Sequence, residues 1–134
     1  METLSPINQQ LVFSLRRVTE RAATAAFYWI GRGASEDAGR AALDAMRSAL
    51  AEIDIDAVVA IGEATRGEAP QPQRGERLGR PSSSFKADIA VDPVEGTSYL
   101  VRGQTNALAV LAVAARGAAF NVKCWMRQFC ASPV

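Results

Sequence analysis

The sequence predicts an α/β fold in which two amphipathic helices precede a set of short apolar strands. Apolar residues recur at helical spacing over residues 6–30 and again over residues 35–53. Three later runs, over residues 56–61, 89–91 and 107–115, are apolar apart from Asp56 and bounded by turn-forming residues, which is typical of buried strands. With 134 residues, the chain is long enough for one domain with a hydrophobic core.

The composition excludes several classes of function. The chain is 49% hydrophobic and 22% charged, as in ordinary globular proteins, and its net charge of +1 gives no bulk electrostatic attraction to nucleic acid or membranes. No uninterrupted apolar run is long enough to span a bilayer, and the first residues do not resemble a secretory signal. We therefore expect a cytoplasmic protein that binds neither nucleic acid nor a membrane.

The absence of histidine narrows the possible chemistry. Without histidine, the two cysteines, Cys124 and Cys130, cannot complete a Cys/His zinc site. The usual Ser-His and Cys-His nucleophile pairs are excluded as well. Two cysteines of this kind fit a reduced, cytosolic setting.

The first helix is expected from Pro6 to about Ile30, after a cap at Ser5. Glycines in the G-R-G string at 31–33 should end it. The cap and the glycines are local signals for the two helix ends. We expect the helix to pack its apolar stripe into the core.

The second helix is expected to begin with Ser35 as its cap. Glu36 and Asp37 follow in its first turn, where acids interact favourably with the positive end of the helix dipole.

An acid also follows the first expected strand. Residues 56–61 lead into Gly62 and Glu63, which places a carboxylate at the carboxyl end of a strand. A solvated turn acid is the alternative interpretation of Glu63. Residues 71–84 are rich in Pro, Arg, Gly and Ser, and we expect a surface loop whose arginines steer an anion or form a solvated face.

The stretch 88–97 holds the densest candidate chemistry. Its apolar residues at 89–91 predict a strand, which we expect Pro93 to end because proline donates no ladder hydrogen bond. Asp92 would then lie at the strand end, with Glu95 three residues later, and Asp88 would have a supporting role at best. Two carboxylates facing one loop repel each other unless a cation lies between them.

Gly96 and Thr97 complete this stretch. Glycine allows backbone N–H groups to approach an anion closely, and threonine adds a hydroxyl. Carboxylates for a hard metal beside N–H groups for a phosphate are what metal-assisted phosphate hydrolysis needs. The alternative is an Asp-Pro turn followed by a Glu-Gly turn, with both acids solvated.

The D-P-V-E-G-T string resembles the metal loop of the lithium-sensitive phosphatase superfamily, whose pattern is D-P-[IVL]-[DE]-G-T. The longer stretches 88–97 and 103–113 are similar to the class II fructose-1,6-bisphosphatases of bacteria, whose close relatives also take sedoheptulose-1,7-bisphosphate. The strings R-V-T-E at 17–20, W-I-G-R-G at 29–33 and G-E-R-L-G at 75–79 also resemble that family.

The resemblance implies a layered α/β sandwich of the sugar-phosphatase type, with residues 1–122 as its amino-terminal part and 123–134 as a divergent tail. It implies hydrolysis of the 1-phosphate of fructose-1,6-bisphosphate with Mg²⁺ or Mn²⁺. Glu63, Asp92 and Glu95 would be metal ligands. Glu95, Gly96 and Thr97 would bind substrate, and Asp92 and Thr97 would be catalytic.

The chain also departs from the family pattern. Ala34 and Ser35 stand where the family has Asp-Lys, and that Asp is a metal ligand. Glu36 or Asp37 could take its place from a shifted turn, although helix capping explains both acids. Trp125 stands near a family tyrosine that holds substrate, and family members continue beyond this length.

These departures lead us to expect a truncated or partial enzyme. Two other interpretations stay open: a non-catalytic remnant or partner-binding fragment, and another phosphomonoesterase of the superfamily, such as an inositol-phosphatase relative. A second copy of the chain and a complementing chain both stay open as partners.

Overall fold

The structure is a computed structural model that describes residues 9–62 and 72–119. Its elements are, in chain order, α1 (Gln9–Phe27), α2 (Ser35–Ala51), β1 (Asp56–Gly62), β2 (Arg77–Gly79), β3 (Lys86–Glu95), α3 (Thr97–Val101) and β4 (Leu108–Ala115). The predicted α/β class is confirmed. No helix in the described ranges is long and apolar enough to cross a membrane.

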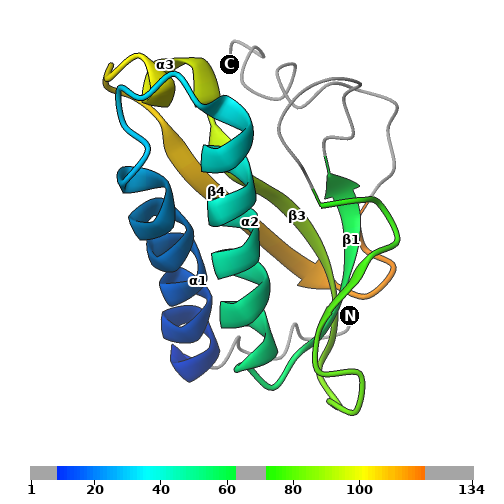
Figure 1. Ribbon diagram of the computed structural model, residues 1–134. Coiled ribbons are helices and arrows are strands. Elements are labelled where there is room, and N and C mark those ends of the chain that lie inside the picture. The colour runs from blue at the N-terminus through cyan, green and yellow to red at the C-terminus, as the bar shows by residue number, and fades with distance from the viewer. Residues whose placement is uncertain (1–8, 63–71, 120–134) are drawn as a thin grey trace, which may run out of the picture.

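The four strands form one mixed sheet in the order β2-β1-β3-β4. The central strands β1 and β3 are parallel, whereas β2 and β4 run antiparallel to their neighbours. Figure 1 shows α1 and α2 side by side against one face of this sheet, with α3 beyond their upper ends. Because β1 and β3 are parallel, their carboxyl ends meet at the same edge of the sheet.

The core lies between these two helices and the sheet. Ile89 and Val91 of β3 are fully buried on the helix side, with Val59 of β1 beside them, whereas Ala90 on the other face is only half-buried. This alternation confirms the predicted orientation of residues 89–91. Against these side chains α1 buries Val18 and two alanines, and their small size lets the helix approach the sheet closely.

Two predicted ends of elements were wrong. Helix α1 ends at Phe27 and the chain continues in a turn, because Trp29 N–H bonds to the Ala26 carbonyl three residues back. The N-cap of α2 is Ala34, not Ser35; Ser35 is the first helical residue, and no side chain caps this end. Glu36 and Asp37 do lie in the first turn of α2, as predicted.

Two predictions about strands were also wrong. The expected loop at 71–84 contains β2, because Leu78 is buried against the core and its neighbours pair with β1. β3 does not stop at Pro93 but continues to Glu95. The cap at Ser5 and Pro6 and the tail at 123–134 lie outside the described residues.

Candidate functional site

An irregularity in β3 decides where Asp92 and Glu95 lie. Asp92 is opposite Val110 of β4 and Glu95 is opposite Leu108, so three steps along β3 match two steps along β4. β3 therefore carries one extra residue between the two acids, which is a β-bulge. Pro93 lies in this bulge, where its missing N–H leaves no ladder bond broken, and this explains why the strand passes through it.

The bulge brings both acids to one face of the sheet. Residues three apart in a regular strand face opposite sides, but Val110 and Leu108 are two apart and share a face. Directly opposed residues in an antiparallel pair also share a face, so Asp92 and Glu95 lie on the same side. This is the face away from Val91 and the helices, and Asp92 is 2% exposed whereas Glu95 is exposed.

Hydrogen bonds hold the loop after Asp92. The Val94 N–H donates to Asp92 Oδ1 at 3.1 Å, and the Thr97 hydroxyl donates to the Val94 carbonyl at 3.0 Å. Because its proton is engaged, the Thr97 oxygen retains only its acceptor role towards a further group. Between them Gly96 is left-handed, with φ 81°, and ends β3 before α3 begins.

The neighbouring strand has a similar irregularity at its carboxyl end. Val59 of β1 pairs with Ile89 and Ile61 pairs with Ala90, so Ala60 is the extra residue there. Gly62 is opposite Val91, which directly precedes Asp92. An added Cβ at Gly62 would lie 2.2 Å from the Pro72 carbonyl oxygen, so only glycine fits this close approach. Both central strands therefore end in bulges, as strands beside functional sites often do.

The third predicted metal ligand, Glu63, lies outside the described residues. Within the described ranges, 9–62 and 72–119, no group of three acids, cysteines or histidines is close enough to hold a metal ion. Asp92 and Glu95 supply oxygen atoms, the donors that Mg²⁺ and Mn²⁺ prefer. The described part of the site thus fits a hard divalent cation in its chemistry and holds two of its three predicted ligands.

The turn before Ala34 lies against α3. This helix begins at Thr97, the last residue of the D-P-V-E-G-T string. Gly31 N–H donates to the Leu100 carbonyl at 3.0 Å, and Gly33 N–H donates to the Val101 carbonyl at 3.0 Å. Two residues after Ala34, the exposed Glu36 bonds to Arg40 within α2 at 2.7 Å. The structure therefore brings the turn before position 34 next to α3 and gives Glu36 a helix-surface partner.

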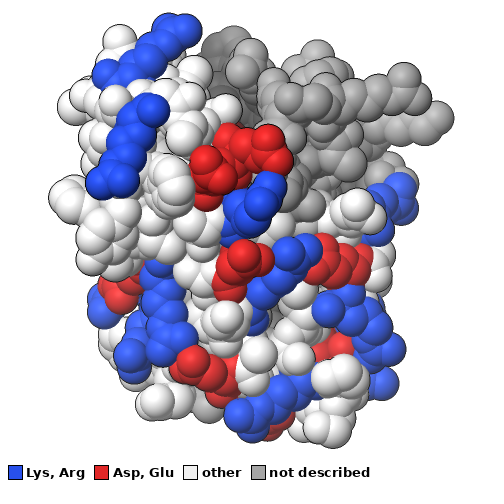
Figure 2. Space-filling model, viewed as in Figure 1, with Lys and Arg blue, Asp and Glu red and all other residues white. Residues whose placement is uncertain are grey.

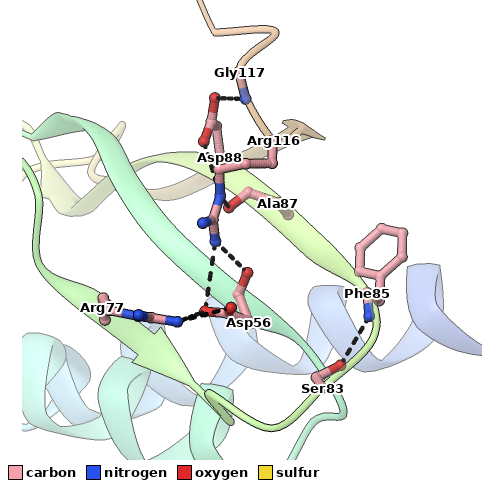
Figure 3. A network of polar contacts seen from close by, with 8 residues as sticks. All are labelled: Asp56, Arg77, Ser83, Phe85, Ala87, Asp88, Arg116 and Gly117. Carbon is pink, nitrogen blue, oxygen red and sulfur yellow. Dashed lines mark hydrogen bonds and ion pairs between the residues drawn. The ribbon is translucent and has the colours of Figure 1, made fainter.

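Asp88 belongs to a different cluster, at the opposite end of β3 (Figure 3). Its Oδ2 accepts the Gly117 N–H at 2.6 Å, and its Oδ1 lies 3.3 Å from Arg116 Nε. Arg116 also donates to the Asp56 carbonyl at 2.8 Å. Asp88 thus fixes the turn after β4 and does not support the loop at Asp92.

Arg77 also belongs to this cluster. From the sequence, we expected it to steer an anion or to lie on a solvated face. Arg77 Nη2 donates to both carboxylate oxygens of Asp56, at 2.9 and 2.8 Å. This hydrogen bond, aided by charge attraction to Arg77 and Arg116, lowers the pKa of the Asp56 carboxyl although burial opposes it. Only the pairing of β2 with β1 brings these two residues together, so no local sequence signal could have revealed the contact.

One hollow in the described part of the chain does not suit an anionic substrate. A cavity of about 420 Å³ lies between the end of α1 and the start of β4, and Pro93 and Val94 form part of its wall. None of its lining residues is charged. Over the face that α1 and α2 occupy, basic and acidic side chains are interspersed, with no large basic patch among the described residues (Figure 2).

Comparison with known proteins identifies similar sequences. Residues 9–133 match the model of the family described as bacterial fructose-1,6-bisphosphatase, glpX-encoded. The chain is 44% identical over 115 residues to fructose-1,6-bisphosphatase 1 class 2 of Escherichia coli K12, and equally to the fructose-1,6-bisphosphatases class 2 of Escherichia coli O6:H1 and Shigella flexneri. Each match covers 86% of this chain and 34% of the relative, so the chain spans about a third of the length of these relatives.

Proposed function

Because the chain belongs to the glpX-encoded family of bacterial fructose-1,6-bisphosphatases, we propose that it carries part of a metal-dependent site for hydrolysing the 1-phosphate of fructose-1,6-bisphosphate. The observation that carries this proposal is the shared face of Asp92 and Glu95 at the carboxyl end of β3. Two carboxylates on one face can share a hard cation, whereas carboxylates on opposite faces cannot.

Each residue of the loop has a distinct part in this proposal. Asp92 and Glu95 would hold Mg²⁺ or Mn²⁺ together with Glu63, which directly follows Gly62 at the end of the parallel neighbour strand. A divalent cation there supplies charge neutralisation at the phosphoryl oxygens and a more acidic bound water. The backbone at Gly96 and Thr97 would bind the phosphate that leaves.

Thr97 would also orient the attacking water. Its hydroxyl proton is donated to the Val94 carbonyl, so its oxygen lone pairs can accept a hydrogen bond from a water molecule. A fixed acceptor restricts the orientation of that water and lowers the entropic cost of attack. No histidine base is required, because in phosphoryl transfer most of the catalysis comes from positioning and charge stabilisation.

One observation favours a second, non-catalytic function for these 134 residues. Ala34 has no carboxylate at the position where the family pattern has a metal-binding Asp, and Glu36 is engaged by Arg40. A fragment with an incomplete ligand set could still bind substrate or a partner chain without turning substrate over. An inositol-phosphatase relative is less well supported, because the three relatives named above are all fructose-1,6-bisphosphatases.

Titration calorimetry with Mn²⁺ tests the proposed site directly. We expect the unmodified chain to bind Mn²⁺ weakly, and both Asp92→Asn and Glu95→Gln to weaken that binding further. Glu52→Gln is the matched control, because Glu52 is an exposed acid just after α2 that pairs with Arg21. Equal Mn²⁺ affinity in the unmodified chain and in Asp92→Asn would rule out the proposed metal site.

A further inference from the structure

We propose that Asn106 is a positioning residue whose left-handed backbone sets the register that places Glu95 on the face of Asp92. The role of Glu95 as a ligand rests on the proposed function, but the register itself does not. Among the described residues Asn106 is the single non-glycine residue with a positive φ, at 75°. The N-A-L-A string that begins with it has no other assigned role.

The backbone of Asn106 lies directly against the loop that follows Glu95. An added Cβ at Gly96 would be 3.4 Å from the Asn106 carbonyl oxygen and 3.7 Å from Ala107 Cα. Gly96 is itself left-handed, with φ 81°. Two residues with left-handed backbone therefore lie close together: Gly96, just after β3, and Asn106, just before β4.

This contact fixes which residue of β4 meets Glu95. β4 begins at Leu108, two residues after Asn106, and Leu108 is the residue opposite Glu95. A residue with negative φ at position 106 would turn the chain differently and shift the start of β4. If Glu95 then lay opposite Ala107 while Asp92 stayed opposite Val110, three steps along β3 would match three along β4, the bulge would be lost, and Glu95 would lie on the face opposite Asp92.

Asparagine suits this position for a physical reason. Left-handed backbone is unfavourable for residues with a Cβ, but asparagine adopts it more readily than most because its short amide can bond locally. Glycine has no such penalty, so Asn106→Gly should preserve the conformation. Asn106→Ala should favour negative φ, and the two variants therefore separate backbone conformation from loss of the side chain.

The first measurement is a proton NMR contact that does not depend on metal. A cross-strand nuclear Overhauser effect between the backbones of Glu95 and Leu108 should be present in the unmodified chain and in Asn106→Gly. It should be weakened or lost in Asn106→Ala. Asn106→Ser, which has a similar conformational penalty, replaces the alanine variant if that variant does not fold. An unchanged contact in the alanine or serine variant would overturn the proposal.

The second measurement is Mn²⁺ affinity. Residues that orient metal ligands typically change affinity about 10-fold to 100-fold when mutated, so we expect Asn106→Ala to bind about tenfold more weakly and Asn106→Gly to match the unmodified chain. A purely structural role would lower the thermal midpoint of Asn106→Ala without changing its affinity while folded, and that result would contradict the positioning role. Absence of Mn²⁺ binding by the unmodified chain would reject the metal site, whereas the NMR contact would still decide the role of Asn106.

Discussion

Asp92 and Glu95 lie on the same face of the sheet although they are three residues apart in one strand. The extra residue in the bulge offsets the ordinary alternation of side chains. The two acids of D-P-V-E therefore share a face, whereas in a regular strand they would lie on opposite faces. The proline contributes by lacking the N–H that a continuous ladder would have used. The bulge is therefore the structural feature that gives this pair of acids the shared face on which the proposed metal site depends.

The first prediction concerns the core beneath this site. Val91→Asp should lower the free energy of unfolding by at least about 3 kcal/mol, because Val91 is fully buried and an unpaired buried carboxylate is costly. Urea denaturation would measure the change. Val12→Asp is the control, because Val12 is 51% exposed on α1 and should change stability little. Superimposable curves for Val91→Asp and the unmodified chain would mean that β3 is not buried as described.

The second prediction is a loss of stability in acid that depends on Arg77. The pKa of Asp56 is lowered in the folded state, chiefly by the Arg77 hydrogen bond, so its ionised form stabilises the fold at neutral pH. That contribution is complete above the ordinary pKa of about 3.9 and is lost as the pH falls through the lower, folded-state pKa. Arg77→Gln should therefore reduce stability at pH 7 and should make the acid side of the stability profile shallower.

Equilibrium unfolding between pH 7 and pH 2 would measure this dependence. Arg16→Gln serves as the comparison, because Arg16 pairs with Glu20 on the exposed surface of α1, where an ion pair contributes little. If both variants gave the same pH profile as the unmodified chain, the contact between Arg77 and Asp56 would have no energetic role.

The sequence predicted the elements that have local signals. The apolar period of α1 and the alternation in β3 are contained in short windows, so both helices and the strands β1, β3 and β4 were predicted correctly in type. β2 was missed because it has only three residues, and Leu78 alone gives no period. These residues pair with β1 only after a long connection along the chain. The cap at Ser35 was misplaced by one residue, a typical error where helix ends depend on one backbone angle.

The sequence named candidate residues for the site but not their geometry. The D-P-V-E-G-T string selected Asp92, Glu95 and Thr97, whose roles stay predictions, whereas the bulge depends on pairing with β4, about fifteen residues further along. Asn106 was not selected, because a left-handed conformation at asparagine is not evident from its neighbours. Contacts that form only when distant strands meet were beyond the reach of local patterns.

The third prediction concerns the position where the family pattern has an acid. Ala34 is the N-cap of α2, and asparagine and aspartate are equally good caps, so either substitution should raise stability by about 1 kcal/mol. Only Ala34→Asp adds a carboxylate beside the turn that bonds to α3. We therefore expect Ala34→Asp, and not Ala34→Asn, to tighten Mn²⁺ binding in calorimetry. Equal affinities for the two variants would show that position 34 does not reach the metal site.

The fourth prediction is that the 134-residue polypeptide by itself hydrolyses fructose-1,6-bisphosphate slowly or not at all. Two-metal hydrolysis stabilises both the attacking and the leaving oxygen, and the loss of one group that stabilises transition-state charge typically costs about 10²–10³ in rate. The tested polypeptide has no carboxylate at Ala34 and spans about a third of the relatives' length, so we expect it to lack several such groups.

The measurement is phosphate release with Mn²⁺, and the double variant Asp92→Asn/Glu95→Gln serves as the background. Ala34→Asp should raise whatever rate the unmodified chain has, because it restores one ligand, and it should have no effect in the double variant. Robust turnover by the unmodified chain, abolished in the double variant, would contradict the prediction. In that case Glu36 or Asp37 would be the first residues to substitute, since the first turn of α2 holds the nearest acids in sequence to position 34.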